Sequence, residues 1–306
     1  MKRTAIHALI NGSLPMKPDQ AKNPIIAELA VRFCRFWRFR LGLRGAGLLI
    51  RFLRKLYPDL QRFSLEYPGL GRCNIQFLDF AWIRQVTAGL NEEEALIKSL
   101  ASLVEGNPII WDVGANSGYL AAEILLKLKP SRMDLFEPNL VHRLTLDSLA
   151  ALNSRIHVHM VGLSDHAGTQ ILYVPCEDGE GATRASLRAE NLSSSKSTSQ
   201  IEINLERGDT IVAAGDAPSP DLLIVDAEGH EGEVIKGMKS TIEIKRPLIA
   251  LEHLFLDDKV LLGMVPQGYE LYTVCDVTAR LLRGLVREKG HNSIMIPQKM
   301  PIPKKG

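Results

Sequence analysis

The sequence predicts an α/β protein built on a mostly parallel sheet that helices cover on both faces. From Ile109 onward, short runs of β-forming residues alternate with segments of helical periodicity. Seven such runs occur, which suffices for one α/β domain. The 306 residues are 45% hydrophobic and 24% charged, so the composition excludes a disordered chain, a collagen and a small disulfide-stapled protein.

The expected strands are short apolar runs. They cover Ile109 to Val113, Met133 to Glu137, His157 to Met160, Leu222 to Asp226, Leu248 to Glu252, Glu270 to Val274 and Ser293 to Ile296. Between them, apolar residues recur every three or four positions, which predicts helices. These helices cover Leu120 to Leu128, Leu140 to Leu152, Glu231 to Ile242 and Asp257 to Met264, and a further one over Glu92 to Val104 leads into the first strand.

Three parts are expected along the chain. Residues 1–64 form a basic, aromatic, helical N-terminal extension, residues 65–107 a connecting region and residues 108–300 the α/β domain. Within that domain, residues 176–200 are rich in Gly, Ser, Glu and Arg, too polar for a core, and are expected to form a mobile loop or lid.

Positive charge is concentrated at the N-terminus. Up to Leu60 there are 12 Lys and Arg against three acids, a net charge of +9, so the rest of this +2 chain carries −7. Within residues 29–57, arginines alternate with Phe, Trp and Tyr. We expect this segment to contact an anionic membrane surface peripherally. A helical appendage whose aromatic side chains pack on the main domain stays an alternative.

The cysteines and the apolar runs indicate the cellular compartment of the protein. The four cysteines include no CxxC pair and no histidine at zinc-ligand spacing, which predicts neither a metal site nor a disulfide framework. The apolar stretch behind Met1 is too short for a signal peptide, and no run of 18 apolar residues occurs. We therefore expect a cytoplasmic protein, with peripheral membrane contact as the only membrane association.

The first strand runs into a glycine turn, Asp112-Val113-Gly114-Ala115-Asn116-Ser117-Gly118-Tyr119. Turns at the carboxyl ends of parallel strands bind ligands in α/β proteins. Gly114 and Gly118 let backbone amides approach a ligand, and Asp112 can accept hydrogen bonds from a cationic amine. Because the spacing departs from GxGxxG and an acid adjoins the turn, a cationic amino-acid ligand fits better than the pyrophosphate of a nicotinamide cofactor.

Polar residues also follow the later strands. Glu137 stands about twenty residues beyond the turn, where an acid accepts both hydroxyls of a ribose; a helix-capping role is the alternative. Asp226, Glu228 and His230 leave one strand end together, and His253 follows the next strand. We expect the catalytic groups among these four residues. For His230 a helix cap, and for His253 a hydrogen-bonded loop histidine, stay alternatives.

Taken together, these blocks resemble the FkbM family of S-adenosylmethionine-dependent methyltransferases. The resemblance rests, in chain order, on the glycine turn, Phe136-Glu137-Pro138, Leu163-Ser164-Asp165 with Gly168, Val225 to Glu231 with Lys236-Gly237, and Arg246-Pro247. It covers residues 105–255, about half of the chain, and not the basic N-terminal region. At His230 the family usually has a small residue, so no role for this histidine follows from the resemblance.

The resemblance implies a class I methyltransferase fold, Rossmann-like, with a seven-stranded sheet whose last strand is antiparallel. S-adenosylmethionine would lie over the strand ends, with its methionine part on the turn, its ribose on Glu137 and its adenine beside Ser164 and Asp165. Asp226 would lie beside the reactive methyl group. The cofactor-binding residues expected in this way are Asp112, Gly114, Asn116, Ser117, Gly118, Glu137, Pro138, Ser164, Asp165 and Asp226.

We therefore expect an O-methyltransferase that acts on a hydroxyl of a saccharide or secondary metabolite, the acceptors associated with the family. His230, His253 or Asp226 would take the hydroxyl proton. A divalent ion on Asp226 and Glu228 is an alternative means of activation. A nucleic-acid acceptor is disfavoured because the α/β part is acidic. The competing hypothesis from another class is a non-catalytic, methyltransferase-like binding protein held by a membrane or a protein partner.

Overall fold

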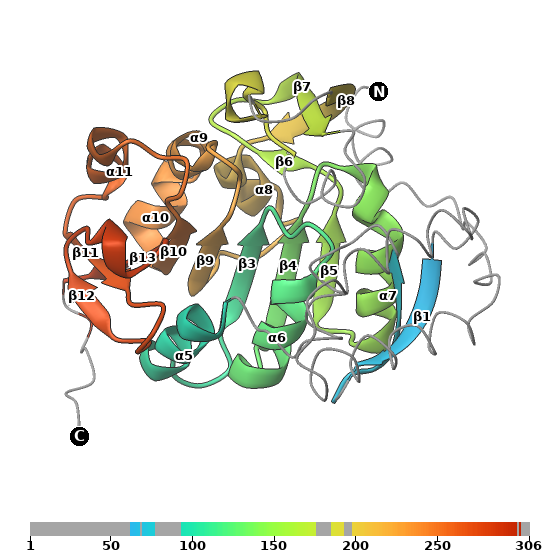
Figure 1. The fold of residues 1–306 in the computed structure, drawn as a ribbon, viewed down its shortest axis with the longest axis horizontal. Coiled ribbons are helices and arrows are strands. Elements are labelled where there is room, and N and C mark those ends of the chain that lie inside the picture. The colour runs from blue at the N-terminus through green and yellow to red at the C-terminus, as the bar shows by residue number, and fades with distance from the viewer. Residues whose placement is uncertain are drawn as a thin grey trace, which may run out of the picture.

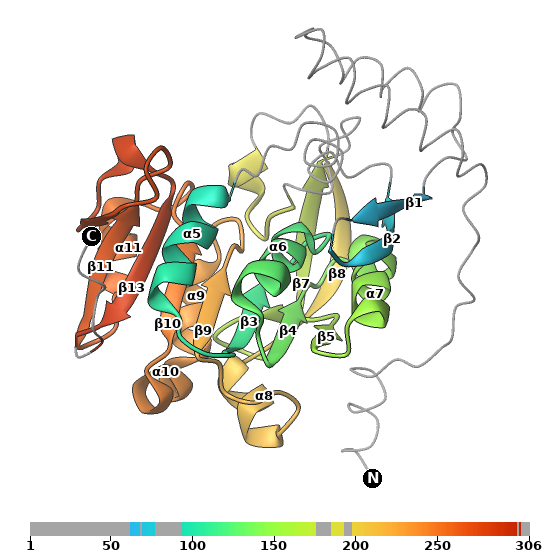
Figure 2. The same ribbon diagram turned by 90° about the horizontal axis from the view of Figure 1, so that it is seen from below.

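The computed structural model describes residues 62–67, 69–76, 93–175, 185–192, 198–298 and 300. Its main body is a large sheet with a layer of helices on each face (Figures 1 and 2). A smaller sheet stands above the ends of the parallel strands, at the top of Figure 1.

The large sheet has the strand order β12-β11-β13-β10-β9-β3-β4-β5 in the described part of the chain. Its strands are β3 (Ile109–Val113), β4 (Arg132–Phe136), β5 (Ile156–His159), β9 (Leu222–Val225), β10 (Leu248–Glu252), β11 (Tyr269–Val274), β12 (Leu281–Arg283) and β13 (Asn292–Pro297). Neighbours from β10 to β5 run parallel, whereas β13 lies antiparallel between β10 and β11. The chain winds from β3 first toward β5 and later back through β9, so the switch point lies between β3 and β9.

This arrangement confirms the predicted mostly parallel sheet with an antiparallel last strand. Each of the seven expected strands is present, with both ends within one residue of the prediction. β12 is an addition at the sheet edge. It is a three-residue strand and too short to leave a period in the sequence.

Alternating side chains of the central strands divide the core in two. Leu222 and Ile224 belong to the core on one face, and Leu223 and Val225 to the core on the other. The first face is covered by α5 (Glu94–Leu103), α6 (Tyr119–Leu128) and α7 (Arg143–Leu152). The second is covered by α8 (Gly208–Ala214), α9 (Glu231–Gly237), α10 (Lys239–Lys245) and α11 (Asp258–Met264).

Two helical predictions need correction. The helix expected over Glu231 to Ile242 is divided at the buried Met238 into α9 and α10. The helix expected over Leu140 to Leu152 begins as a short 3-10 turn, η1 (Leu140–His142), before α7. In both places apolar residues keep the helical spacing, so the sequence period does not mark the break.

The smaller sheet contains β6 (Gly162–Leu163), β8 (Thr198–Glu206) and β7 (Gly168–Pro175), in this spatial order. Ser186 extends it through a bridge to Tyr173, and η2 (Ala189–Leu192) follows. The expectation that residues 176–200 form a loop too polar for a core is therefore wrong in its described part, where Ser186 and Leu192 are buried and residues 198–200 belong to β8. Residues 176–184 and 193–197 lie outside the described residues.

The connecting region contains more structure than expected. A hairpin of β1 (Arg62–Tyr67) and β2 (Gly71–Gln76) packs against α7, and β1 overlaps the end of the extension predicted to be helical. α5 contributes Leu96 and Leu100 to the main core. The basic segment 29–57 lies outside the described residues. None of the helices in the described part combines the length and apolar character that crossing a bilayer requires.

Candidate active site

Carboxyl groups stand at the ends of neighbouring parallel strands. Asp112 lies in β3, Glu137 follows β4, Asp226 follows β9 and Glu252 ends β10. Each is two residues beyond a side chain of the core beneath α5, α6 and α7, so alternation directs all four to that face. The sheet thereby brings together acids that are far apart in the sequence, at the switch point where α/β proteins bind ligands.

The glycine turn approaches the next strand end closely. Gly114 has φ +83°, and a Cβ atom there would lie 1.8 Å from the carbonyl oxygen of Asp226. Only glycine fits this approach. Gly118, at φ +76°, makes room for Leu146 and Leu149 of α7, so its absence of a side chain serves helix packing.

Glu137 is held by backbone amides on both sides. Its Oε2 accepts a hydrogen bond from the Asn116 amide at 2.8 Å, and its Oε1 accepts one from the Asn139 amide at 2.7 Å. Burial raises the pKa of Glu137, while His142 and these two amides act to lower it. Each carboxylate oxygen has a second lone pair, so the group can still accept two hydroxyls.

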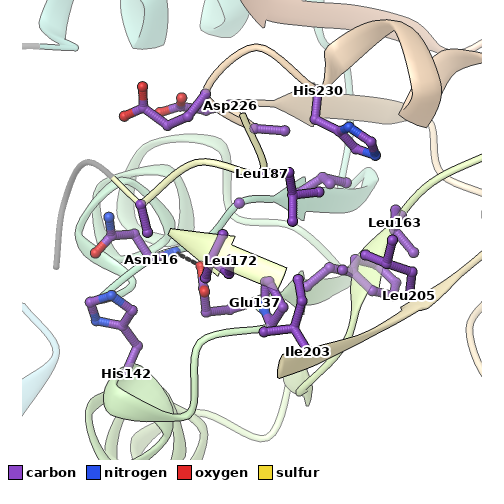
Figure 3. Close-up of a pocket in the computed structure, with 18 residues that line it drawn as sticks. Asn116, Glu137, His142, Leu163, Leu172, Leu187, Ile203, Leu205, Asp226 and His230 are labelled. Carbon is purple, nitrogen blue, oxygen red and sulfur yellow. Dashed lines mark hydrogen bonds between the residues drawn. The ribbon is translucent and has the colours of Figure 1, made fainter. Parts of the chain in front are cut away.

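A pocket of about 680 Å³, open to solvent, lies between the large and the small sheet (Figure 3). Asn116 and Asp226 line one end, Glu137 the middle, and His230 the end beside Leu163 (Figure 3). The rest of the wall is largely apolar and comes from strand ends and the small sheet: Val113, Phe136, Leu163, Leu172, Ala185, Leu187, Ile203 and Leu205. Few polar groups in an apolar cleft are typical of a small-molecule site.

Asp112 lies beneath this pocket and is only 1% exposed. Burial raises its pKa to about 7, with further contributions from the charges of Asp226 and Glu137. Its Oδ2 is fully buried and has no hydrogen-bond partner in the part of the chain that the structure describes. A buried acid in this state gains most from a positive charge placed nearby.

The turn after β9 is shaped by Glu231. Its Oε1 accepts hydrogen bonds from the amides of Ala227 at 3.0 Å and Gly229 at 3.1 Å, which closes the turn that leads from β9 into α9. Glu228 is held at φ +49°, a left-handed conformation that costs free energy for a residue with a side chain. The carbonyl oxygen of Glu228 accepts hydrogen bonds from Ser186 Oγ and Asn191 Nδ2, both at 2.8 Å. The small sheet is thereby tied to the acidic turn.

The structure separates the two histidine candidates. His230 lines the pocket, and its Nε2 lies 3.1 Å from Ser164 Oγ. His253 does not line it. Its Nε2 donates to the Gly290 carbonyl at 3.0 Å, so its Nδ1 accepts from Ser293 Oγ at 2.8 Å. Both ring nitrogens of His253 are thus engaged in holding β13.

Some of the other expected site residues line the pocket, and some do not. Gly114, Asn116, Glu137, Pro138, Asp226 and Glu228 line it, whereas Asp112, Ser117, Gly118, Ser164 and Asp165 lie behind it or beside it. Asp165 accepts a hydrogen bond from His166 at 2.8 Å, and that interaction lowers its pKa. Among the described residues, no three His, Cys, Asp or Glu side chains are grouped to hold a metal ion, so the metal alternative gains no support.

Sequence reasoning missed two polar residues and one apolar wall. His142, in η1, lines the pocket near Glu137 and Asn116 (Figure 3), but no motif marks it. Glu252 ends β10 at the same level at which Asp226 follows β9, and strand alternation could have found it. Ile201, Ile203 and Leu205 alternate with polar residues in β8, a period of two that predicts a half-buried strand.

Comparison with known proteins agrees with this geometry. The family model described as "Methyltransferase FkbM domain" matches residues 112–273. The hexuronic acid methyltransferase AglP of Haloferax volcanii is 30% identical over 191 residues, which cover 61% of this chain and 72% of that relative.

Solved structures of methyltransferases also match. An FkbM methyltransferase from Methylobacillus flagellatus has 17% sequence identity and a TM-score of 0.42, over 71% of this chain and 55% of that one. A precorrin-6y C5,15-methyltransferase from Geobacter metallireducens has 14% identity and a TM-score of 0.37, over 66% and 85% of the two chains. The family match spans more than half of this chain, and the protein therefore belongs to the FkbM family of methyltransferases.

Proposed function

We propose that this protein transfers a methyl group from S-adenosylmethionine to an oxygen atom of a saccharide, in the pocket between the two sheets. The observation that carries the proposal is the row of carboxyl groups at the switch point. There, two amides position Glu137, and one oxygen of Asp112 lacks a partner within the described ranges of the chain.

The residues of the pocket fit S-adenosylmethionine. Glu137 would accept the two ribose hydroxyls with the lone pairs that the amides of Asn116 and Asn139 leave open. Asp112, buried beneath the turn, would compensate the positive charge of the methionine part. When bound, the cofactor supplies an electrophilic methyl group on a sulfonium sulfur.

The chain's own contribution is then to position the reactants and to exclude water. Gly114 and the left-handed Asn116 set the turn against the carbonyl group of Asp226. Leu172, Leu187 and Ile203 give the pocket an apolar roof. Because methyl transfer disperses charge, an apolar site costs the reaction little, and fixed alignment of the acceptor supplies most of the acceleration.

The saccharide part of the proposal is supported by the relative AglP, which is named as a hexuronic acid methyltransferase. The pocket is open to solvent, which suits an acceptor that is part of a longer glycan.

Calorimetric titration with S-adenosylmethionine tests the cofactor. We expect micromolar binding to the wild type that is lost in Glu137→Ala, because the ribose hydroxyls then have no carboxylate to accept their hydrogen bonds. Glu243→Ala, which removes an exposed acid of α10, is the matched control and should bind normally. Absence of binding to the folded wild type would contradict the proposal.

Transfer of a labelled methyl group to a panel of saccharides tests the acceptor. We expect label on a saccharide that contains hexose or hexuronic acid units. Tight binding of the cofactor together with label on none of the saccharides would refute this part alone.

We also propose that residues 29–57 contact an anionic membrane, where a lipid-linked saccharide would be held. The support is the alternation of arginine with aromatic residues in the sequence. Co-sedimentation with anionic liposomes should be lost when residues 1–60 are deleted. Equal sedimentation of the full and shortened chains would exclude this contact.

A further inference from the structure

We infer that Glu252 positions Asp226 as the group that takes a proton from an acceptor hydroxyl, so the acceptor oxygen belongs to a hydroxyl and not to a carboxylate. The inference rests on the proposed function and names the chemical class of its acceptor. Glu252 belongs to none of the motifs that the sequence singles out, and its place follows from the strand register.

The register sets the two carboxyl groups side by side. Val225 of β9 pairs with Leu251 of β10 in parallel register, so Asp226 and Glu252 occupy the next level together. On the other side, Glu252 pairs with Asn292 of β13. His253 is one residue further along, and alternation turns it to the opposite face.

Of the two acids, Asp226 lines the pocket and Glu252 does not. The register makes the two carboxyl groups neighbours on one face of the sheet, and Oδ1 of Asp226 is buried and has no hydrogen-bond partner among the described residues. Two carboxyl groups can share a hydrogen bond only if one of them carries a proton. Glu252 therefore acts through Asp226.

The surrounding charges decide which carboxyl group holds that proton. Burial and the charges of Asp226, Glu228 and Glu93 raise the pKa of Glu252. Burial and the charges of Glu93 and Glu231 raise the pKa of Asp226 to about 7, which is below the value of about 9 for Glu252, because Glu252 and the cationic His291 act to lower the pKa of Asp226. Glu252 is accordingly the donor, and Asp226 is the carboxylate at the pocket wall.

His291 connects the pair of Asp226 and Glu252 to a third acid, Glu93. Its Nδ1 lies 2.9 Å from Asp276 and its Nε2 3.4 Å from Glu93, and Asn292 Nδ2 donates to Glu93 at 2.7 Å. These contacts raise the pKa of His291 to about 9, so it is a cation at neutral pH. Glu93, at the start of α5, is thus anchored beside the pair rather than free to turn into the pocket.

In this environment Asp226 can act as a base that takes the proton of an acceptor hydroxyl. The hydroxyl proton passes to the Asp226 carboxylate while the acceptor oxygen forms its bond to the methyl carbon. The bond from that carbon to sulfur breaks, and its electron pair stays on sulfur. A carboxylate acceptor has no proton to lose, and Asp226, Glu228 and Glu93 would repel its charge.

Infrared spectroscopy of the intact protein tests the pair without an acceptor. At about pH 8, wild-type protein should show the carbonyl band of a protonated carboxyl group, which Glu252→Gln removes. Asp226→Asn should shift that band, because the bond partner changes. Asp112→Asn is the control for the other buried acid and should leave the band in place. A band that persists unchanged in Glu252→Gln would overturn the inference.

Labelled transfer tests the acceptor class. The probes are a disaccharide that ends in hexuronic acid and its carboxyl-reduced counterpart, which keeps the ring hydroxyls. We expect label on both, stable to mild alkali as an ether is. Label on the hexuronic acid alone, released by mild alkali as from an ester, would overturn the inference. Label on neither, with the cofactor still bound, would contradict the saccharide part of the proposed function and leave the infrared result to decide on Glu252.

Kinetics on the accepted probe separate positioning from a general loss of structure. Glu252→Ala should lower kcat by about tenfold or more, within the range of general-base effects, and move the acidic limb of the pH profile upward. Glu252→Gln keeps an N–H donor toward Asp226 and should restore most of the rate. Equal losses in both variants with an unmoved pH profile would argue against positioning.

Discussion

At the scale of single residues, the site depends on buried acids that the fold does not fully compensate. Asp112, Asp226 and Glu231 each have one oxygen that finds no hydrogen-bond partner among the residues described. Unpaired buried carboxyl groups cost stability, and proteins keep them where a ligand completes their interactions. Replacing one of these acids should therefore stabilise the free protein and weaken its binding of the ligand.

Replacing Asp112 by asparagine should stabilise the free protein at pH 8 and weaken its binding of S-adenosylmethionine. The folded pKa of about 7 exceeds the usual value of 3.8, so the folded state binds the proton more tightly, and the stability that this adds below pH 3.8 is lost as pH rises from 3.8 to about 7. A gain of about 1 kcal/mol would raise the Tm by about 2–4 °C. Thermal unfolding at pH 8 and at pH 5 checks this, because the gain should be smaller at pH 5, where the carboxyl group of the folded protein is still protonated. Asp147→Asn, an exposed change on α7, is the control.

Two glycine-to-alanine changes distinguish the cost of a left-handed backbone from the cost of a collision with a neighbouring backbone. Gly114 and Gly215 have φ values of +83° and +77°, but only at Gly114 would a Cβ atom collide with backbone, the Asp226 carbonyl group. Gly215→Ala should cost about 1–2 kcal/mol for the left-handed conformation alone. Gly114→Ala should cost more and abolish cofactor binding. Urea unfolding compares the two; equal losses would mean that the approach to Asp226 is unimportant.

At the scale of elements, the loops of the site are held by helices and by the small sheet. The last residue of α9, Gly237, lies so close to the Ser164 carbonyl oxygen that a Cβ atom would be 1.9 Å from it. Ser186 and Asn191 hold the turn after β9 through the Glu228 carbonyl group. α5, expected in the connecting region, packs into the main core, so we propose that the methyltransferase domain begins with this helix.

Two glycine-to-alanine changes in helices test the contact between α9 and the Ser164 loop. A Cβ atom added at Gly263 in α11 would meet no neighbouring atom within 4 Å, so Gly263→Ala should stabilise the protein by about 0.5–1 kcal/mol. Gly237→Ala gains the same helix propensity but must displace Ser164, and it should destabilise. Chemical denaturation measures both. Stabilisation by Gly237→Ala would show that the Ser164 loop yields at little cost.

At the scale of the whole molecule, cofactor binding should be linked to pH. A cationic ligand favours the ionised form of Asp112, whose pKa in the free protein is raised to about 7. Affinity should therefore fall as pH drops below 7, and binding at pH 6 should release protons. Calorimetry in two buffers of different ionisation enthalpy counts them. The release should shrink in Asp112→Asn, and a proton count independent of this residue would contradict the linkage.

Local patterns were sufficient to predict the strands, the family and most pocket-lining motifs. A parallel strand covered on both faces reads as an apolar run, as in Leu222–Val225, and the glycine turn and Glu137 carry signals of their own. The break at Met238 and the strand β12 left no such signal, because the helical period continues across the first and the second is three residues long.

The partners of each acid depend on strand order and register, which no local pattern encodes. Glu252 meets Asp226 because β10 pairs with β9, and His253 is directed to β13 by the alternation that follows. The roof of the pocket comes from β7 and β8, which are separated in sequence from the turn that they cover. Residue types and spacing thus predicted the fold, and the resemblance of the motifs to a family implied the cofactor class. The long-range pairing of strands decided which carboxyl groups are neighbours, because it brings distant segments of the chain within a few ångströms of each other.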